Sequence, residues 1–156
     1  MNKAVKTTNP ARDALFPRDT RRSLPIALLR ARETVMEQFR GMLAAHGMTE
    51  QQWRVIRILE ERDSIDASEM AARAFILAPS LTRIIRTLEE RGLITKRKDG
   101  SDGRKIILDI TPAGRKIIEE VAPESGLIYE AIEKRFGKQK LVLLLDLLEE
   151  LAAAGQ

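Results

Sequence analysis

The chain has 156 residues, among them 27 Lys and Arg, 23 Asp and Glu, one His and no Cys, and its formal net charge is +4. At roughly 100–200 residues per domain, this length predicts one domain, or one domain with an appended element. The absence of Cys excludes disulfides and thiolate metal sites, and a lone His46 argues against a conventional zinc site, so no metal or other cofactor is expected. The longest aliphatic run, residues 141–145, is far shorter than the about 20 residues of a membrane span, and the N-terminus lacks the apolar segment of a secretory signal. We therefore expect a cytoplasmic protein.

The charges are unevenly distributed along the chain. Residues 1–22 hold six basic and two acidic side chains, a net charge of +4. Residues 73–105 hold nine basic and four acidic side chains, a net charge of +5, whereas residues 109–156 hold six basic and nine acidic ones, a net charge of −3. A cationic stretch beside an acidic one indicates that one face of the protein meets a polyanion.

Residues 1–20 show no hydrophobic period, and we interpret them as a flexible basic arm. A strong helix is predicted from Leu24 to about Ala45, and its apolar stripe is wide enough to be buried on two sides. Gly47 follows the end of this helix.

Two capping motifs predict the next helices. In Thr49-Glu50-Gln51-Gln52 the hydroxyl of Thr49 can accept from the third helical N–H group while Gln52 reaches back, which starts a helix that continues to about Arg62. The same pattern in Asp66-Ala67-Ser68-Glu69 starts a short helix that ends near Ala74.

A helix with a polar outer face follows the short one. Pro79 fits its first position, and the helix ends at Gly92. Its inner face carries Leu and Ile at helical spacing, and its outer face carries Ser, Thr and Arg. Ala78 is a poor cap in front of this helix, so we expect its first turn to become ordered on a bound partner.

The sequence period then changes from that of a helix to that of a strand. Residues 93–98 and 105–110 predict two strands, and Gly100-Ser101-Asp102-Gly103 predicts the turn of a β-hairpin between them. Thr111-Pro112 then starts another helix, which Pro123 is expected to kink or interrupt. A last Leu-rich helix is predicted from about Lys138 to Ala153.

This order of elements predicts a winged helix-turn-helix. A short helix, a tight connection and a helix with an outward Ser, Thr and Arg face form the helix-turn-helix, and the basic hairpin after it forms the wing. Guanidinium groups can bind guanine O6 and N7 in the major groove, and hydroxyls can contact bases or phosphates. Cations on the wing can reach the backbone or the minor groove. We therefore predict a protein that binds double-stranded DNA.

Several stretches resemble the MarR-type winged-helix transcription regulators. They are residues 49–57 (TEQQWRVIR), 79–84 (PSLTRI), 88–94 (LEERGLI) and 102–104 (DGR), followed by 108–114 (LDITPAG). Within this family the chain is similar to the branch that represses homoprotocatechuate (hydroxyphenylacetate) degradation operons. That similarity rests on residues 46–48 (HGM) leading into the QQW motif, on 76–80 (ILAPS) and on 132–137 (IEKRFG).

The resemblance implies a mainly α fold with a small β wing, flanked by dimerisation helices. It implies a homodimer on palindromic DNA and the following division: arm 1–20, dimerisation helix 21–47, winged helix-turn-helix 48–111 and C-terminal dimerisation helices 112–156. It also implies that Asp102 orients Arg104 for the minor groove. The expected DNA-binding residues are Ser68, Pro79, Ser80, Thr82, Arg83, Arg86, Arg97, Lys98, Ser101, Asp102 and Arg104.

Relatives in the family commonly bind small aromatic acids, which implies a repressor that an aromatic carboxylate releases from DNA. Such a pocket needs an apolar wall and a cation for the carboxylate. Candidate wall residues are Leu24, Leu28, Met48 and Trp53, and candidate polar anchors are Arg22, Ser23, Arg30, His46 and Arg54. Trp53 could equally be a core residue, and His46 could be a capping or surface group.

Two alternatives compete with a DNA-binding regulator. An enzyme is disfavoured because the chain has no glycine-rich phosphate loop, no HExxH, no GxSxG and no metal-ligand spacing. A winged helix used only for protein contacts is the second alternative. The outward Arg83 and Arg86 together with a cationic wing argue against it, because such a module needs no matching basic hairpin.

Overall fold

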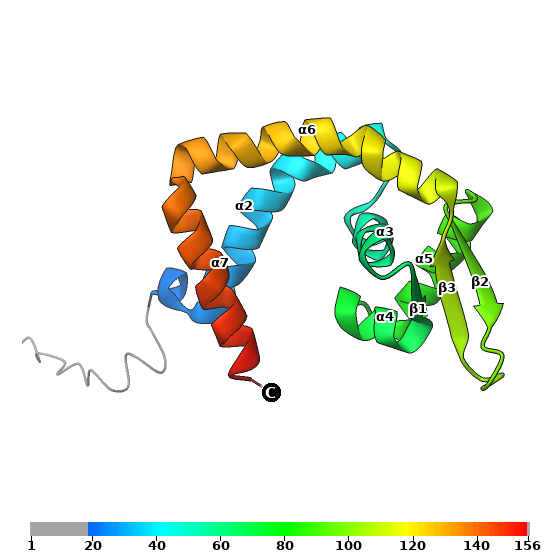
Figure 1. Ribbon diagram of the computed structural model, residues 1–156. Coiled ribbons are helices and arrows are strands. Elements are labelled where there is room, and N and C mark those ends of the chain that lie inside the picture. The colour runs from blue at the N-terminus through cyan, green and yellow to red at the C-terminus, as the bar shows by residue number, and fades with distance from the viewer. Residues whose placement is uncertain (1–18, 156) are drawn as a thin grey trace, which may run out of the picture. The chain divides into compact units, whose positions relative to one another are not determined.

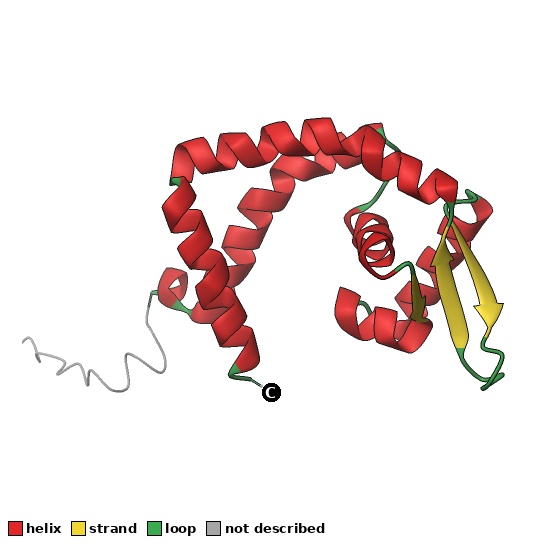
Figure 2. Cartoon of the chain, viewed as in Figure 1, coloured by secondary structure: helices red, strands yellow, loops and turns green. Residues whose placement is uncertain are grey.

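The computed structural model describes residues 19–155, and Figures 1 and 2 show its helices and strands. Residues 1–18 of the predicted arm lie outside this range. The arm's last two residues are described: Asp19 caps a short 3-10 helix, η1 (Thr20–Arg22), by accepting a hydrogen bond from the backbone N–H of Arg21 (3.0 Å). The chain divides into two compact units after Gln38, so each unit is described separately.

Helix α2 (Leu24–Ala45) begins in the first unit and ends in the second, at the residues predicted for it. In the second unit, its last two turns bury Phe39, Met42 and Leu43. The ring of Phe39 packs against that of Tyr129 in a tilted arrangement, with centroids 5.1 Å apart and an interplanar angle of 58°. After α2 the chain turns at Gly47, whose φ of +66° is accessible to glycine at little cost.

Helix α3 (Glu50–Arg62) begins with the predicted capping box. The Thr49 hydroxyl accepts from the N–H of Gln52 (3.2 Å), and the Gln52 side chain accepts from the N–H of Thr49 (3.0 Å). The inner face of α3 buries Val55, Ile56 and Leu59 at the centre of the core.

A three-residue strand, β1 (Ser64–Asp66), precedes helix α4 (Ala67–Ala74) and was absent from the prediction. It is the edge strand of a three-stranded antiparallel sheet with the order β1-β3-β2. The predicted capping box at Asp66 is only half formed. The Asp66 carboxylate accepts from the N–H groups of Ser68 and Glu69, but the Glu69 side chain pairs with Arg73 instead of returning to the cap.

Helix α5 (Ala78–Glu90) follows α4 after a three-residue turn and has the most one-sided distribution of apolar residues. Leu81, Ile84, Ile85 and Leu88 are buried on its inner face. The N-cap is Leu77 and the helix begins at Ala78, so Pro79 occupies the second helical position. The prediction that Pro79 takes the first position is therefore off by one residue. The first turn is already helical in the chain alone, which contradicts the expectation that it becomes ordered only on a partner.

Strands β2 (Ile94–Lys98) and β3 (Ile106–Ile110) form the predicted hairpin. Their register pairs Lys96 with Leu108, and β1 pairs Ile65 with the same Leu108 from the other side. Because Leu108 is fully buried, the base of the wing is fixed to the core, while the tip of the hairpin extends into solvent.

Helix α6 (Pro112–Phe136) leads from the wing to helix α7 (Lys138–Ala153). The Thr111 hydroxyl caps α6 by accepting from the N–H of Gly114 and donates to the carbonyl of Gly92, as an N-cap should. Of the two outcomes predicted at Pro123, a kink or an interruption, the interruption is wrong, because α6 continues through this residue. Pro123 and the carbonyl-bearing Glu119 one turn earlier are both exposed, so water can satisfy the hydrogen bond that proline removes.

Helix α7 has no buried residue and exposes six large apolar side chains: Val142, Leu143, Leu144, Leu145, Leu147 and Leu151. An exposed helix face with this many large apolar side chains is typical of a protein interface. Within residues 19–155, no helix combines the length and the apolar character needed to cross a membrane.

Candidate DNA-binding surface and effector site

The outer face of α5 carries the polar side chains expected for DNA recognition. Thr82 and Arg83 are exposed and Ser80 is half-buried, while the neighbouring Leu81 points into the core. The Thr82 hydroxyl donates to the carbonyl of Ala78 (3.0 Å), which leaves the oxygen lone pairs free to accept. The amphipathic period of the helix thus places hydroxyl and guanidinium groups together in solvent.

The two arginines of α5 are in different states. Among the described residues, the guanidinium of Arg83 has no ion pair. The guanidinium of Arg86 instead donates from Nε to Glu90 Oε1 (2.8 Å), one turn later on the helix. This hydrogen bond and the Glu90 charge raise the pKa of Arg86 above its usual value. The guanidinium of Arg83 is therefore available to a ligand, whereas that of Arg86 must first leave Glu90.

Replacing Glu90 by glutamine is expected to raise DNA affinity about twofold, because exposed pairs of this spacing are weak and their loss frees Arg86 for a phosphate. The measurement is a DNA titration at several salt concentrations. Glu120→Gln is the matched control, since Glu120 forms the same type of pair with Lys116 on α6. An equal gain in both variants would mean that only net charge matters.

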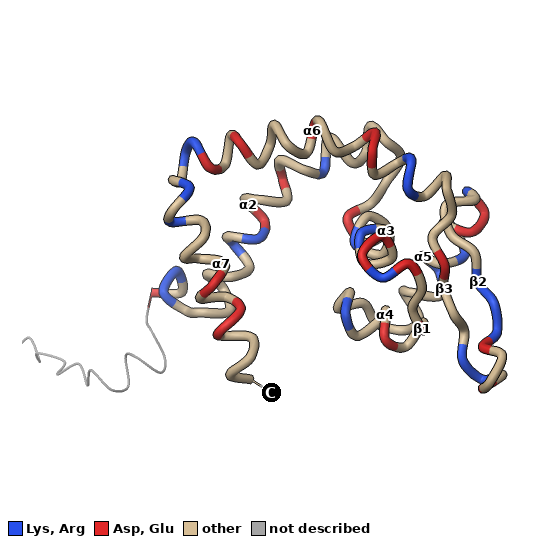
Figure 3. Tube along the Cα trace, viewed as in Figure 1, with Lys and Arg blue, Asp and Glu red and all other residues tan. Residues whose placement is uncertain are grey.

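The wing is basic along β2, and the loop that follows carries two acidic and two basic residues (Figure 3). Two of its cations pair within the wing and the adjoining helix: Arg97 Nε lies 2.9 Å from Asp109 Oδ2 on β3, and Lys96 Nζ lies 2.8 Å from Glu89 Oε2 on α5. Lys98 and Arg104 are exposed, and neither has an ion pair among the described residues. Because α5 packs against β2, the free cations of the helix and the wing belong to one lobe, residues 48–111.

Hydrogen bonds within the chain order the wing tip. Asp102 accepts from the backbone N–H of Arg104 (3.1 Å), and the Ser101 hydroxyl donates to Asp99 (3.2 Å). The resemblance implied that Asp102 orients the Arg104 side chain. In the structure the Asp102 carboxylate instead binds the backbone N–H of Arg104 and so orders the turn.

The other two expected DNA contacts lie at helix starts. Ser68 is exposed in the first turn of α4, and Pro79 is exposed in the first turn of α5. The Asp66 carboxylate already accepts from the first N–H groups of α4, whereas α5 has no side-chain cap, so of these two helix starts only that of α5 is uncapped and suits a phosphate contact. All the expected DNA-binding residues are thus at the surface, with Ser80 and Asp102 only partly exposed.

Five of the nine expected effector residues belong to the first unit. Arg22 is in η1, Ser23 follows it with its N–H bound to the Thr20 carbonyl, and Leu24, Leu28 and Arg30 lie in the first two turns of α2. Of these, only Ser23 is partly buried, and the other four are exposed.

The remaining four effector candidates lie in the second unit, and two of them already have partners. His46 Nε2 lies 2.9 Å from Glu124 Oε1, and Arg54 Nη1 donates to the carbonyl of Ala74 at the end of α4 (2.6 Å). Met48 is buried, and Trp53 is partly buried on α3. Arg54 thus caps the C-terminus of a helix, where a cation is favourable.

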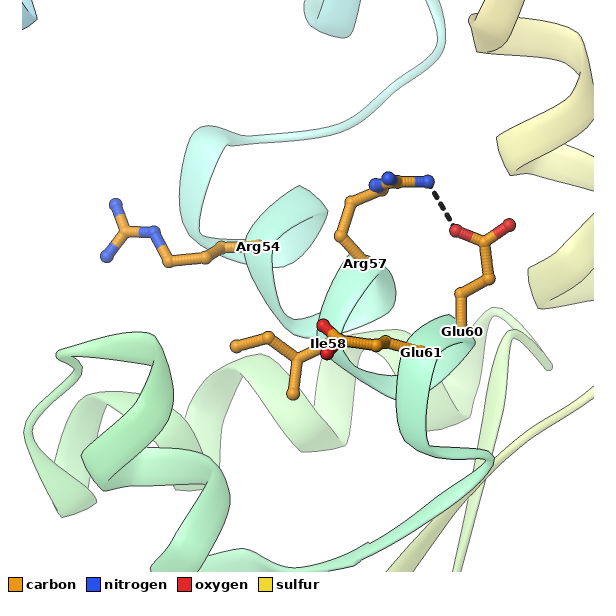
Figure 4. Close-up of a pocket in the computed structure, with 5 residues that line it drawn as sticks. All are labelled: Arg54, Arg57, Ile58, Glu60 and Glu61. Atoms are coloured by element: carbon orange, nitrogen blue, oxygen red, sulfur yellow. Dashed lines mark hydrogen bonds and ion pairs between the residues drawn. The ribbon is translucent and has the colours of Figure 1, made fainter. Parts of the chain in front are cut away.

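A pocket of about 480 Å³ lies along α3 and is lined by Arg54, Arg57, Ile58, Glu60 and Glu61. Figure 4 shows Arg54 and Arg57 pointing apart, with Arg57 joined to Glu60 by an ion pair. One apolar residue among four charged ones is unlike a site for an aromatic ring, which needs an apolar wall. Within residues 19–155, no group of His, Asp and Glu residues could hold a metal ion.

Comparison with known proteins identifies the family. A model of the MarR family matches residues 48–106. The HTH-type transcriptional regulator FarR of Neisseria gonorrhoeae is 45% identical over 130 residues, which are 83% of this chain and 89% of that protein. The chain belongs to the MarR family. The homoprotocatechuate degradative operon repressor of Escherichia coli is 42% identical over 133 residues, which are 85% of this chain and 90% of the repressor.

Solved structures of MarR-type regulators have the same fold. NadR in complex with 4-hydroxyphenylacetate is 42% identical, with a TM-score of 0.77 and coverage of 84% of this chain and 96% of NadR. The transcriptional repressor CouR, bound to a 23-mer DNA duplex, is 28% identical, with a TM-score of 0.76 and coverage of 83% of this chain and 92% of CouR. These matches confirm the predicted winged helix-turn-helix, and this MarR-family chain is a DNA-binding transcriptional regulator.

Sequence reasoning missed the acidic partners that occupy some of the basic side chains. Glu90 could have been found from its i,i+4 spacing to Arg86. Asp109 lies twelve residues from Arg97 and could have been found only from the strand register. It also missed Arg91, which donates to the carbonyl of Gly47 (2.6 Å) and so ties the end of α5 to the turn after α2.

Proposed function

We propose that this protein is a homodimeric repressor of an aromatic-acid catabolic operon and that an aromatic carboxylate such as 4-hydroxyphenylacetate releases it from DNA. The observation that carries DNA recognition is the unpaired guanidinium of Arg83 on α5 together with that of Arg104 on the wing of the same lobe. The choice of effector is supported by the name of the 42% identical operon repressor and by the ligand of NadR.

The dimer would form through residues 21–47 and 112–156, and the two winged lobes, residues 48–111, would bind the half-sites of a palindrome. Support comes from the apolar face of α7, which the chain alone leaves exposed. Leucines at helical spacing are well suited to pack against a second copy.

We propose the nine predicted residues as effector contacts; Trp53 and Met48 would supply apolar surface in the second unit, and Leu24 and Leu28 in the first. Arg22 and Arg30 are the better candidates for the carboxylate, because Arg54 and His46 already hold partners at hydrogen-bond distance, whereas Arg22 and Arg30 only attract the Asp19 carboxylate through their charge. A cation held only by charge attraction binds a carboxylate at a lower cost than one that must first break a hydrogen bond.

The effector can release DNA only by binding a DNA-incompatible conformation more tightly than the DNA-bound one. A 100-fold loss of DNA affinity requires about 2.7 kcal/mol of coupling, which is within the usual range for allosteric proteins. The coupling would act on the separation of the two α5 helices.

The test is footprinting on the region upstream of the protein's own gene and its neighbours, with and without aromatic acids. A protected palindrome is expected, and specific affinity should fall about 10³-fold or more between 50 and 200 mM salt, since several phosphates are neutralised. Salt-independent binding, or no protected site, would reject the DNA-binding model.

Trp53 is the only tryptophan of the chain, so its fluorescence reports directly on the proposed effector site. Titration with 4-hydroxyphenylacetate should change its emission, raise the melting temperature and release the operator. Tyramine, which carries an aminomethyl group in place of the carboxylate, is the matched control and should do none of these. Equal effects of both compounds would remove the carboxylate from the proposal.

We also infer that the protein is not an enzyme and acts in the cytoplasm. The relatives that support this are transcriptional regulators, and an operator on the chromosome is accessible only to a protein in that compartment.

A further inference from the structure

Leu77 is an apolar residue in a position where a polar one would stabilise the fold. It is the N-cap of α5, provides no side-chain hydrogen bond to the helix, and is 79% exposed. Ser, Thr, Asp and Asn are strongly preferred at this position because their oxygen accepts from a free N–H group of the first turn. Leucine satisfies none of these groups and leaves its side chain in water.

The chain caps the other two helices of the lobe, and helix α6 that follows it, with polar residues. Thr49, Asp66 and Thr111 accept backbone hydrogen bonds at the starts of α3, α4 and α6. The helix with the exposed Ser, Thr and Arg face is thus the one helix of the described lobe, residues 48–111, that starts without a side-chain cap. A stability cost at one helix start indicates that Leu77 serves binding.

The surroundings of Leu77 indicate what it binds. It leads directly into the surface formed by Ser80, Thr82 and Arg83, which is polar and cationic. A partner for this surface must be anionic and rich in acceptors, and it must also offer a small apolar group at its edge. The major groove of DNA combines these features, because thymine places a C5-methyl group beside the acceptors of its neighbours.

We propose that Leu77 contacts the C5-methyl group of one thymine in each operator half-site and so adds base discrimination to that of Arg83. This inference rests on the proposed DNA-binding function and deepens it. Burial of one methyl group is worth about a fourfold change in affinity per half-site. The contact carries no charge, so it should leave the salt dependence of binding unchanged.

The test combines a protein substitution with a matched DNA substitution. Each thymine of the operator is replaced in turn by 2′-deoxyuridine, which pairs with adenine as thymine does and lacks only the methyl group. For the unaltered protein, one position per half-site should show an affinity loss of about fourfold. Leu77→Ser should bind the thymine and uracil duplexes equally, while keeping its affinity for nonspecific DNA.

Leu77→Ser should also fold well, since serine restores the missing cap and should raise the melting temperature by about 2–4 °C. A gain in stability with a loss of methyl recognition separates a binding role from a structural one. Phe75→Asn is the matched control, because Phe75 is exposed in the same turn, has a φ of +51° and should not affect methyl recognition.

Three results would overturn the inference about Leu77 and leave DNA binding intact. They are an operator without any methyl-sensitive position, methyl sensitivity that survives in Leu77→Ser, and methyl sensitivity lost in Phe75→Asn only. Loss of dimerisation in Leu77→Ser would instead place this side chain against a second copy of the chain and would also overturn it. Failure of the unaltered protein to bind any operator would reject the proposed function itself.

Discussion

Replacing Gly114 by alanine is expected to lower the free energy of unfolding by about 3 kcal/mol or more. Gly114 is buried in the first turn of α6, and a Cβ added there would lie 2.2 Å from the carbonyl oxygen of Leu93 and 2.8 Å from Ile110 Cγ1. That carbonyl accepts a hydrogen bond from the N–H of Thr111, so backbone must move to make room. The check is chemical denaturation followed by circular dichroism.

Gly41→Ala provides the control for helix propensity. Gly41 lies within α2, and an added Cβ would meet nothing within 4 Å, so alanine should stabilise the helix by up to about 1 kcal/mol. Because Gly114 connects the base of the wing to α6, its variant should also weaken DNA binding by displacing Arg104. Similar stability of the two variants would show that the start of α6 can shift without cost.

Helix positions were predictable from sequence because local chemistry determines them. The bounds of α2, α3 and α7 match their predictions, and both hydrogen bonds of the Thr49 capping box are present. A cap involves residues within four positions of one another, so the sequence contains all the information that is needed.

Features that depend on distant partners were not predictable in this way. The three-residue strand β1 exists because Ile65 pairs with Leu108, which is forty-three positions away. The interruption expected at Pro123 was wrong because solvent exposure, and not the local sequence, decides whether a lost hydrogen bond is tolerated.

The candidate DNA-binding surface was predicted by position but not by electrostatic state. Helical spacing placed Arg83 and Arg86 on the outer face, where both are exposed. It did not reveal that Arg86 is paired with Glu90 and that Arg97 is paired with Asp109. A count of basic residues therefore overestimates the number of cations that are immediately available to DNA.

The effector residues were the least predictable because their partners come from several helices. Pairing of His46 with Glu124 joins residues seventy-eight positions apart, and Arg54 contacts the end of a neighbouring helix. Composition suggested these side chains as carboxylate anchors, but only tertiary packing could reveal the groups that compete for them.

Arg83→Ala is expected to remove base discrimination at one position of each half-site and to reduce operator affinity by about 1–3 kcal/mol per half-site. The guanidinium is exposed on α5 and has no ion pair among the described residues, so its free state needs no rearrangement before it binds guanine O6 and N7. The measurement is a binding-site selection that compares the preferred sequences of the variant and the unaltered protein.

Arg104→Ala is the matched comparison, because Arg104 is an exposed arginine of the wing that, like Arg83, has no ion pair in the described part of the chain. On the wing it should act mainly through phosphates, so its loss should weaken binding similarly across sequences and reduce the salt slope by about one charge per lobe. Arg83→Ala should lower the slope less and change the preferred sequence. If the preferred sequence is unchanged in Arg83→Ala, the guanidinium acts on the backbone, and recognition of the bases must come from the hydroxyls of α5 and the neighbouring Leu77.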